Sequence, residues 1–159
     1  MKINKIITIL ALFLLFSCDY QPIYSAKNIE KKNNFTIKSI VFSGENKINQ
    51  SLKNNLTNYL NKEKEKINYD LIIDSIVNKK ISSKNKKGNP ERYVIKIAFN
   101  VHVFEQDKLK NTKIFEESFE YKNKSSKYNL KIYEEDLKKN LVSLLSENIV
   151  KYLNSINDI

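Results

Sequence analysis

Residue 18 is the only cysteine in a chain of 159 residues, and its thiol is the side chain with the widest range of chemistry. Because a lone thiol has no partner within the chain, it cannot form an internal disulfide. It is therefore a free thiol, one half of an intermolecular disulfide, or a point of covalent attachment. Cys18 lies between an apolar run that ends at Phe16 and Pro22, one of only two prolines.

The segment before the cysteine has the features of an export signal. Lys2 and Lys5 precede an almost wholly apolar run from Ile6 to Phe16. A run of about 11 residues fits a signal-peptide core and is too short to span a bilayer, which also disfavours an ordinary buried cysteine in a helix. No small-x-small cleavage site follows, and Leu15 to Cys18 (LFSC) resembles a bacterial lipobox. We predict residues 1–17 to be a lipoprotein signal peptide and Cys18 to carry a multi-chain lipid anchor.

The second chemical feature of the sequence is its positive charge. The chain has 28 basic and 18 acidic residues, a net charge of +10. Removing the predicted signal peptide leaves 26 basic residues against 18, or +8. This balance indicates an anionic partner: nucleic acid, phospholipid or lipopolysaccharide. Arg92 is the only arginine, and lysine, asparagine and isoleucine abound together as AT-rich coding would produce, so the sign is more informative than the magnitude.

Basic residues gather in the stretch 78–92, NKKISSKNKKGNPER. We predict this stretch to be a long hairpin tip, with Gly88 and Pro90 as its turn signals. Like charges this close repel, and folding does not require them together, so the tip is either a solvated loop or a site for anions. The residues are Lys79, Lys80, Lys84, Lys86 and Lys87, with Arg92 just beyond them.

Three further lysines, Lys122, Lys124 and Lys127, lie between the last predicted strand and the last predicted helix. We expect this loop and the lysine-rich tip to follow different ends of the third strand. On that expectation the two groups of lysines meet only if the long tip folds back.

The remaining polar residues do not form a catalytic or metal-binding pattern. His102 lies on the polar face of a predicted strand without a second histidine, which favours a solvated side chain over a metal ligand. Glu116 and Glu117 are adjacent on a strand and point to opposite faces, whereas residues 134–136 (EED) are expected near a helix start, where they favour the dipole. Phosphate-binding loops and nucleophile elbows are absent from the sequence. We predict a protein that is not an enzyme and needs neither cofactor nor metal.

Apolar periodicity predicts the elements that position these residues. The third strand is the clearest, because apolar side chains occupy every second position from Tyr93 to Val103. The first helix has an apolar stripe from Ile48 to Leu60 at spacings of three and four, with Asn46 as its cap. The predicted strands are 35–42, 69–77, 93–103 and 112–121, the last with Phe115, Phe119 and Tyr121 on one side. The final helix, 132–156, has a stripe of Leu137, Leu141, Leu144, Leu145, Ile149, Tyr152 and Ile156.

The element order, strand, helix, strand, strand, strand, helix, indicates an α+β fold. The economical packing is a two-layer sandwich, a four-stranded sheet with both helices on one face. A crossover through the first helix makes the first two strands parallel if they are neighbours, and the last three strands form an antiparallel meander. We expect a signal peptide at 1–17, a lipidated N-terminus and tether at 18–34, and one domain at 35–159.

The residues from Cys18 to Tyr24, CDYQPIY, resemble the C-G-F-x-P-L-Y start of the lipopolysaccharide-assembly lipoprotein family LptE, of the alphaproteobacterial type. The element order, the length and the long C-terminal helix resemble that family as well. The resemblance implies an outer-membrane lipoprotein that plugs the barrel protein LptD, assists its assembly and contacts lipopolysaccharide. Asp19 replaces the family's glycine. In enteric bacteria Asp at this position favours retention at the inner membrane, so a periplasmic lipoprotein of another envelope transport complex is the alternative.

The resemblance gives roles to two sets of residues. Tyr20, Pro22 and Tyr24 lie too close to the anchor to help the core much, so we expect them to pack against the partner or the rim of the domain. On the functional account, the lysines of the tip meet the phosphates of lipid A, although a solvated loop remains the competing interpretation. A nucleic-acid partner is disfavoured by the export signal, the single arginine and the lack of an aromatic and basic stacking face.

Overall fold

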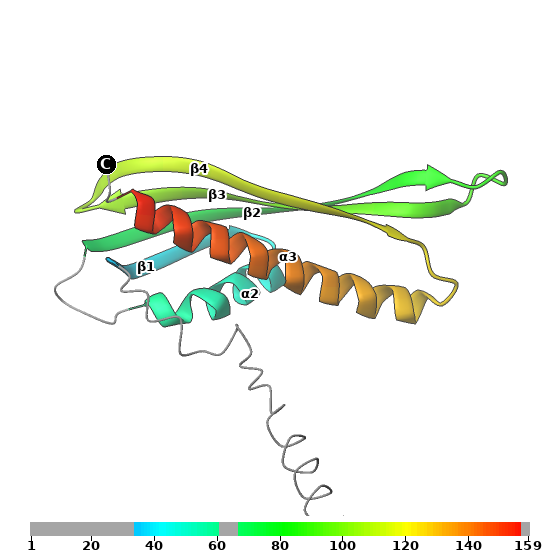
Figure 1. Cartoon of the computed structure of the whole chain (residues 1–159), viewed down its shortest axis with the longest axis horizontal. Coiled ribbons are helices and arrows are strands. Elements are labelled where there is room, and N and C mark those ends of the chain that lie inside the picture. Colours follow the sequence, from blue (N-terminus) through cyan, green and yellow to red (C-terminus); the bar gives the residue numbers. More distant parts are fainter. Residues whose placement is uncertain (1–33, 61–66, 157–159) are drawn as a thin grey trace, which may run out of the picture. The chain divides into compact units, whose positions relative to one another are not determined.

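The structure of the protein is a computed structural model, and it describes residues 34–60 and 67–156. Its elements follow the predicted order of strand, helix, three strands and helix (Figure 1). A short 3-10 helix, η3 (Thr57–Tyr59), continues the first helix. The other bounds are β1 Phe35–Gly44, α2 Asn46–Leu56, β2 Ile67–Lys84, β3 Pro90–Glu105, β4 Lys108–Lys122 and α3 Lys127–Ser155.

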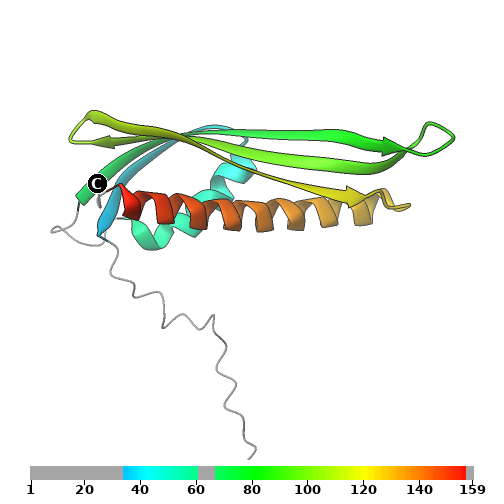
Figure 2. The same cartoon turned by 45° about the horizontal axis from the view of Figure 1, so that its top comes forward.

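The four strands form one mixed sheet in the order β1-β2-β3-β4. β1 runs parallel to β2, because the intervening α2 brings the chain back to the end of the sheet where β1 began. β2, β3 and β4 are joined by two reversals and pair antiparallel. Both helices cover the same face of the sheet (Figures 1 and 2), so the predicted two-layer α+β sandwich is confirmed. No helix or strand of the described residues covers the other face, which we call the open face.

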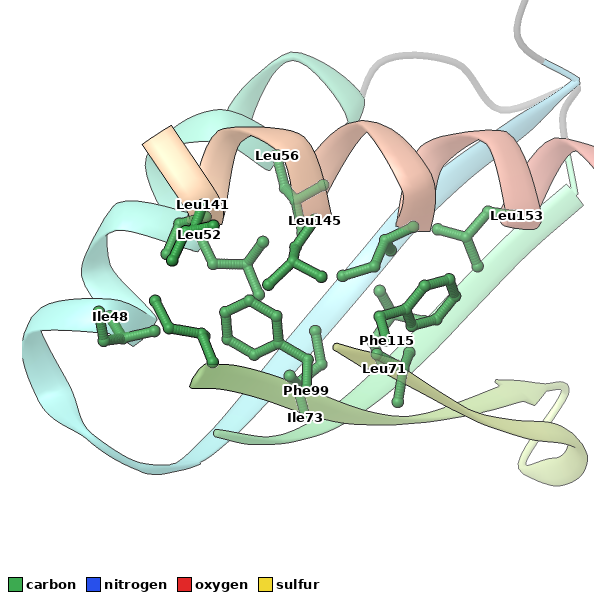
Figure 3. Close-up of a cluster of buried hydrophobic side chains, with 14 of the residues drawn as sticks. Ile48, Leu52, Leu56, Leu71, Ile73, Phe99, Phe115, Leu141, Leu145 and Leu153 are labelled. Carbon is green, nitrogen blue, oxygen red and sulfur yellow. The ribbon is translucent and has the colours of Figure 1, made fainter. Parts of the chain in front are cut away.

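The core fills the space between the sheet and the two helices, as Figure 3 shows. Every second side chain of β2 from Tyr69 to Ile73, and of β3 from Ile95 to Val103, points into it, because successive residues of a strand face opposite sides. Each large apolar side chain buried here stabilises the fold by roughly 1.5–3 kcal/mol. The central members are Leu71, Ile73, Ile97 and Phe99 of the sheet, Ile48, Leu52 and Leu56 of α2, and Leu141, Leu145, Ile149 and Leu153 of α3.

Two residues predicted for the core are exposed. Leu144 retains 43% of its accessible surface, because the buried positions of α3 recur every four residues from Leu137 and leave it on the outer side. Phe119 retains 44%, although its neighbour on β3, Ile95, is fully buried. Phe119 lies on the edge strand β4, and in the described part of the chain no further strand covers the outer side of β4.

The lysine-rich stretch is not a long loop, and this prediction was wrong. β2 continues to Lys84 and β3 begins at Pro90, so Lys79 and Lys80 belong to a strand. The outer half of β2 lacks the apolar alternation that predicts a strand, because the apolar side chains of this part of the hairpin belong to β3. Lys79 pairs with Ile95 and Lys80 with Val94. Backbone pairing with an apolar strand is enough to extend the hairpin.

Only residues 85–89 form the turn between β2 and β3. The side chain of Asn85 accepts hydrogen bonds from the backbone N–H groups of Lys87 and Asn89, each at 3.0 Å. Gly88 has a φ of 80°, a left-handed conformation that glycine adopts without strain. The tip is therefore a short, internally bonded turn at the end of a long hairpin.

Three other boundaries differ from the prediction. β4 starts at Lys108, because Gln106 and Asp107 adopt φ values of 51° and 62° and form a tight two-residue turn. α3 starts at Lys127, where Ser126 is the cap and its hydroxyl accepts from the N–H of Asn129. The predicted cap of the first helix, Asn46, is its first helical residue instead. The cap position is Glu45, whose side chain makes no capping hydrogen bond. The backbone N–H of Glu45 donates to the Ser75 hydroxyl.

Candidate functional site

The β2–β3 turn and the β4–α3 connection lie at the same end of the sheet (Figure 1). Arg92, near the start of β3, pairs with Lys122 at the end of β4. Asn123 fastens the β4–α3 connection to the start of β3: its N–H donates to the carbonyl of Glu91 at 2.8 Å and its side-chain amide to the carbonyl of Pro90 at 2.9 Å. The expectation that the two lysine groups meet only if the tip folds back was wrong, because the antiparallel reversal between β3 and β4 returns the chain to the end from which β3 starts.

This end of the sheet carries a concentration of exposed positive charge, which we name the cationic end. The seven lysines of the cationic end make no ion pair within residues 34–60 and 67–156. The ammonium of Lys124 lies 4.0 Å from the centre of the Tyr133 ring, a cation–π contact that leaves its charge uncompensated. The cationic end comprises Lys80, Lys84, Lys86, Lys87, Lys122, Lys124 and Lys127, all exposed.

Two of the predicted site residues are engaged by the fold instead. The Lys79 ammonium lies 2.5 Å from a carboxylate oxygen of Glu134 and 4.3 Å above the Tyr93 ring. Arg92 lies 3.5 Å from the carboxylate of Glu120, which also accepts from the hydroxyl of Ser82. The charges of Lys79 and Arg92 are therefore partly neutralised within the chain, unlike those of the cationic end.

A joint beneath the cationic end holds the hairpin to α3. The hydroxyl of Tyr121, on β4, donates to Glu134 of α3 at 2.7 Å, and the same carboxylate oxygen receives Lys79 from β2. The Tyr121 ring stacks on Tyr93 with centroids 5.8 Å apart. Burial, followed by the bond to the Glu134 carboxylate, raises the pKa of Tyr121 well above its usual range. The Glu134 carboxylate thus links β2, β4 and α3, and holds the two lysine-bearing strands to the helix.

The other polar residues singled out in the sequence lie in local pairs. His102, expected to be solvated, is partly shielded on the open sheet face, with one ring nitrogen 2.9 Å from the Thr112 hydroxyl and the other 3.8 Å from Asp74. Glu116 pairs with Lys96 at 2.7 Å. Glu134 is seven residues past the start of α3, so it does not act at the helix N-terminus as predicted. Within the described part of the chain, no cluster of three potential metal ligands occurs.

A groove of about 840 Å³ lies between α2 and α3. Its walls carry both signs of charge, from Lys47 and Glu45 of α2 to Glu135 and Lys138 of α3. Lys47 and Glu135 lie 3.9 Å apart across it. Such a lining does not favour ligands of one charge, so the cationic end remains the candidate site.

Sequence reasoning missed Asn123 and the joint at Tyr121, Glu134 and Lys79. An asparagine directly after a strand is a turn signal, but its bonds to another connection depend on the strand order. The predicted sites at Cys18, Tyr20, Pro22 and Tyr24 lie outside the described residues. Of the helices in the described residues, none combines the length and apolarity required to cross a bilayer.

Comparison with known proteins finds similarity at the level of structure. No protein-family model matches the chain, and no curated protein matches its sequence. The crystal structure of rare lipoprotein B from Shewanella oneidensis matches with a TM-score of 0.61 at 16% identity, covering 77% of this chain and 96% of that one.

Two other solved lipoproteins match over similar lengths. The solution structure of uncharacterized lipoprotein B from Nitrosomonas europaea has a TM-score of 0.60 at 14% identity, with 78% and 85% of the two chains covered. A putative lipoprotein from Caulobacter crescentus has a TM-score of 0.52 at 12% identity, with 75% and 88% covered. The domain that carries the cationic end therefore has a fold found in lipoproteins of several bacteria.

Proposed function

We propose that this chain is an outer-membrane lipoprotein that plugs an LptD-type β-barrel, helps to assemble it, and takes part in transport of lipopolysaccharide to the cell surface. Three observations support the proposal: the lipobox-like segment that ends at Cys18, the CDYQPIY segment that resembles the LptE family, and a fold shared with solved bacterial lipoproteins. The role is one of binding and assembly rather than catalysis.

The observation that carries the proposal is the cationic end. Its lysines lie at one end of the sheet and make no ion pair among the described residues, so their mutual repulsion is not offset within the chain. Asn123, in the connection after β4, is bonded at this place to the start of β3, next to the β2–β3 turn. A ligand with several phosphates would relieve the repulsion, and lipid A with its inner sugars is such a ligand. Lysine suits this task as a mobile point charge.

The first test measures lipopolysaccharide binding to the full chain at two salt concentrations. We expect the triple change of Lys84, Lys86 and Lys87 to Gln to weaken binding about ten- to hundredfold, since a lysine near an anionic lipid surface contributes about 1 kcal/mol. The salt dependence should also become shallower, because screening acts on the charges that take part.

The matched control changes Lys53, Lys108 and Lys151 to Gln, which lowers the net charge equally at exposed positions outside the cationic end. If both triple variants lose the same affinity, the effect belongs to net charge and not to the site. An unchanged affinity and salt slope in the first variant would reduce the lysines to solvated surface.

The second test is purification of the tagged protein in mild detergent. We expect one large β-barrel partner that survives purification, because a plug within a barrel buries an obligate interface of more than roughly 2,000 Å². Recovery of inner-membrane transporter subunits instead would favour the alternative that Asp19 raises, a lipoprotein of another envelope complex.

A further inference from the structure

The two edges of the sheet differ in how they are protected against pairing with another strand. An exposed edge presents free backbone N–H and C=O groups, and natural proteins protect it with charges, bulges or covering elements. β4 forms one edge, and seven of its 15 residues are charged. β1 forms the other edge, and Lys38 is the only charged residue among its ten. The charged residues of β4 therefore protect its edge, whereas the edge of β1 lacks such protection.

The first half of β1 is nevertheless closed. On the side away from β2, Ile37 forms a bridge with Leu60. A register shift between Ile37 and Ser39 bulges the strand at Lys38, so the single charge and the irregularity fall at the same place. From Ser39 to Gly44 the pairing with β2 is regular, and in the described part of the chain no strand pairs with the outer side of this segment. The unprotected edge is thus Ser39–Gly44.

The side chains along the unprotected edge are apolar and incompletely covered. Val41 points to the open face of the sheet and retains 59% of its accessible surface. Ile40 and Phe42 point to the helices, and both are only partly buried against the core. A further strand beside β1 would cover all three, which favours association through the hydrophobic effect as well as through backbone hydrogen bonds.

A hollow of about 560 Å³ lies on the open face next to this edge. Its apolar walls are Val41 of β1, Ile72 of β2 and Phe104 of β3. Lys38, Asp70 and Asp107 also line it, and the Ser39 hydroxyl donates to the Asp70 carboxylate at 2.5 Å, so part of the hydrogen-bonding capacity of Asp70 is met within the chain. The hollow can therefore receive an apolar side chain that projects from a strand lying beside Ser39 and Val41.

We infer that Ser39–Gly44 accepts an extended segment of a partner protein as a fifth strand of the sheet. Backbone hydrogen bonds to β1 supply the affinity, and an apolar side chain seated against Val41, Ile72 and Phe104 supplies the selectivity, a mode in which strand addition combines an edge with a pocket. The segment it fits alternates apolar side chains, because a fifth strand would cover the apolar side chains of Ile40, Val41 and Phe42. This inference goes beyond the proposed function, since it requires neither a barrel nor lipopolysaccharide.

The test uses a display library of random 12-residue peptides selected on the immobilised full-length protein in detergent. We expect the selected peptides to alternate apolar residues and to bind Val41→Lys at least tenfold more weakly. Ile114→Lys is the matched control, because Ile114 is also an apolar residue on the open face of an edge strand, 62% exposed, but lies on the protected edge. It should bind the peptides as the unmodified protein does.

A second measurement needs no variant of the protein. Two series of peptides carry methyl groups on the backbone nitrogens of alternate residues, one at the odd and one at the even positions. Binding should be abolished in the series whose methylated nitrogens face β1 and unchanged in the other series. Equal binding by the two methylated series, equal loss in Val41→Lys and Ile114→Lys, or failure to select any peptide overturns the inference. A concentration-dependent dimer of the chain that Val41→Lys abolishes would also overturn it, because the occupant would then be a second copy.

Discussion

At the scale of single residues, the lysines around the hairpin divide by what they contact. Lys79 has a carboxylate at 2.5 Å and an aromatic ring below it, so it helps to fasten β2 to α3. Lys84, Lys86 and Lys87 have no ion pair among the described residues and are exposed. The sequence shows one run of lysines, whereas their chemical roles depend on which of them reach Glu134, a residue 55 positions beyond Lys79.

The hydroxyl of Tyr121 gives this joint a dependence on pH. Its pKa is raised in the folded protein by burial and by Glu134, whereas in the unfolded chain it titrates near its usual value of about 10. The neutral hydroxyl therefore stabilises the fold below pH of about 10, and the contribution is lost as the pH rises because only the unfolded chain ionises. We expect the free energy of unfolding to fall more steeply between about pH 9.5 and 11.5 in the native protein than in Tyr121→Phe. Urea titrations across this range check it, and parallel pH profiles would contradict it.

At the scale of elements, the sequence predicts the parts whose side chains decide their structure. Alternation from Tyr93 to Val103 predicts β3, and the stripe from Ile48 to Leu56 predicts α2, because burial of one face dictates each pattern. The outer half of β2 could not be found in this way. Its pairing partners supply the apolar side chains, and a polar strand beside an apolar one has the composition of a loop.

The candidate site was predictable in its residues but not in its assembly. The tip lysines follow from the sequence, whereas the approach of Lys122 to Arg92 requires the strand order β2-β3-β4 and the register between the last two strands. The bond from Asn123 to Pro90 joins the ends of two different connections. Neither turn contains a local signal for the other, so only the folded sheet brings them together.

The two glycines that join elements should respond differently to a methyl group. Gly44 ends β1 at a φ of 89°, and a Cβ there would lie 2.1 Å from the carbonyl oxygen of Ser75. Gly88 has a φ of 80° in the hairpin turn and no atom within 4 Å of such a Cβ. We expect Gly44→Ala to lower the free energy of unfolding by about 2–5 kcal/mol, through both backbone strain and overlap.

Gly88→Ala is the matched control for this prediction, and it should cost only about 1–2 kcal/mol, the strain alone. Denaturant unfolding of the two variants measures the difference. Equal losses would mean that the close approach at Gly44 is relieved by a small backbone movement.

At the scale of the whole molecule, we expect the chain to be held at a membrane through Cys18. In Cys18→Ser the protein should remain an unprocessed precursor or no longer fractionate with membranes, because the acyl chains have no attachment point. Labelled palmitate and membrane fractionation measure this directly. If the unmodified protein takes up no label, the interpretation of residues 1–17 as a lipoprotein signal is wrong.

The bonds of Asn123 to the start of β3 also bear on when, during folding, the lysines of the cationic end come to lie at one end of the sheet. The lysines of the cationic end come from two connections, and these become neighbours only after β4 has paired with β3 and Glu134 has met Lys79 across 55 positions of sequence. If the chain is exported from its N-terminus, as the predicted signal peptide implies, α3 is delivered last. A partly translocated chain thus carries the same lysines at low density along an open polymer, and contacts between distant residues form slowly. The dense patch arises together with the native state, so attraction to a polyphosphate ligand would distinguish finished molecules from those still folding.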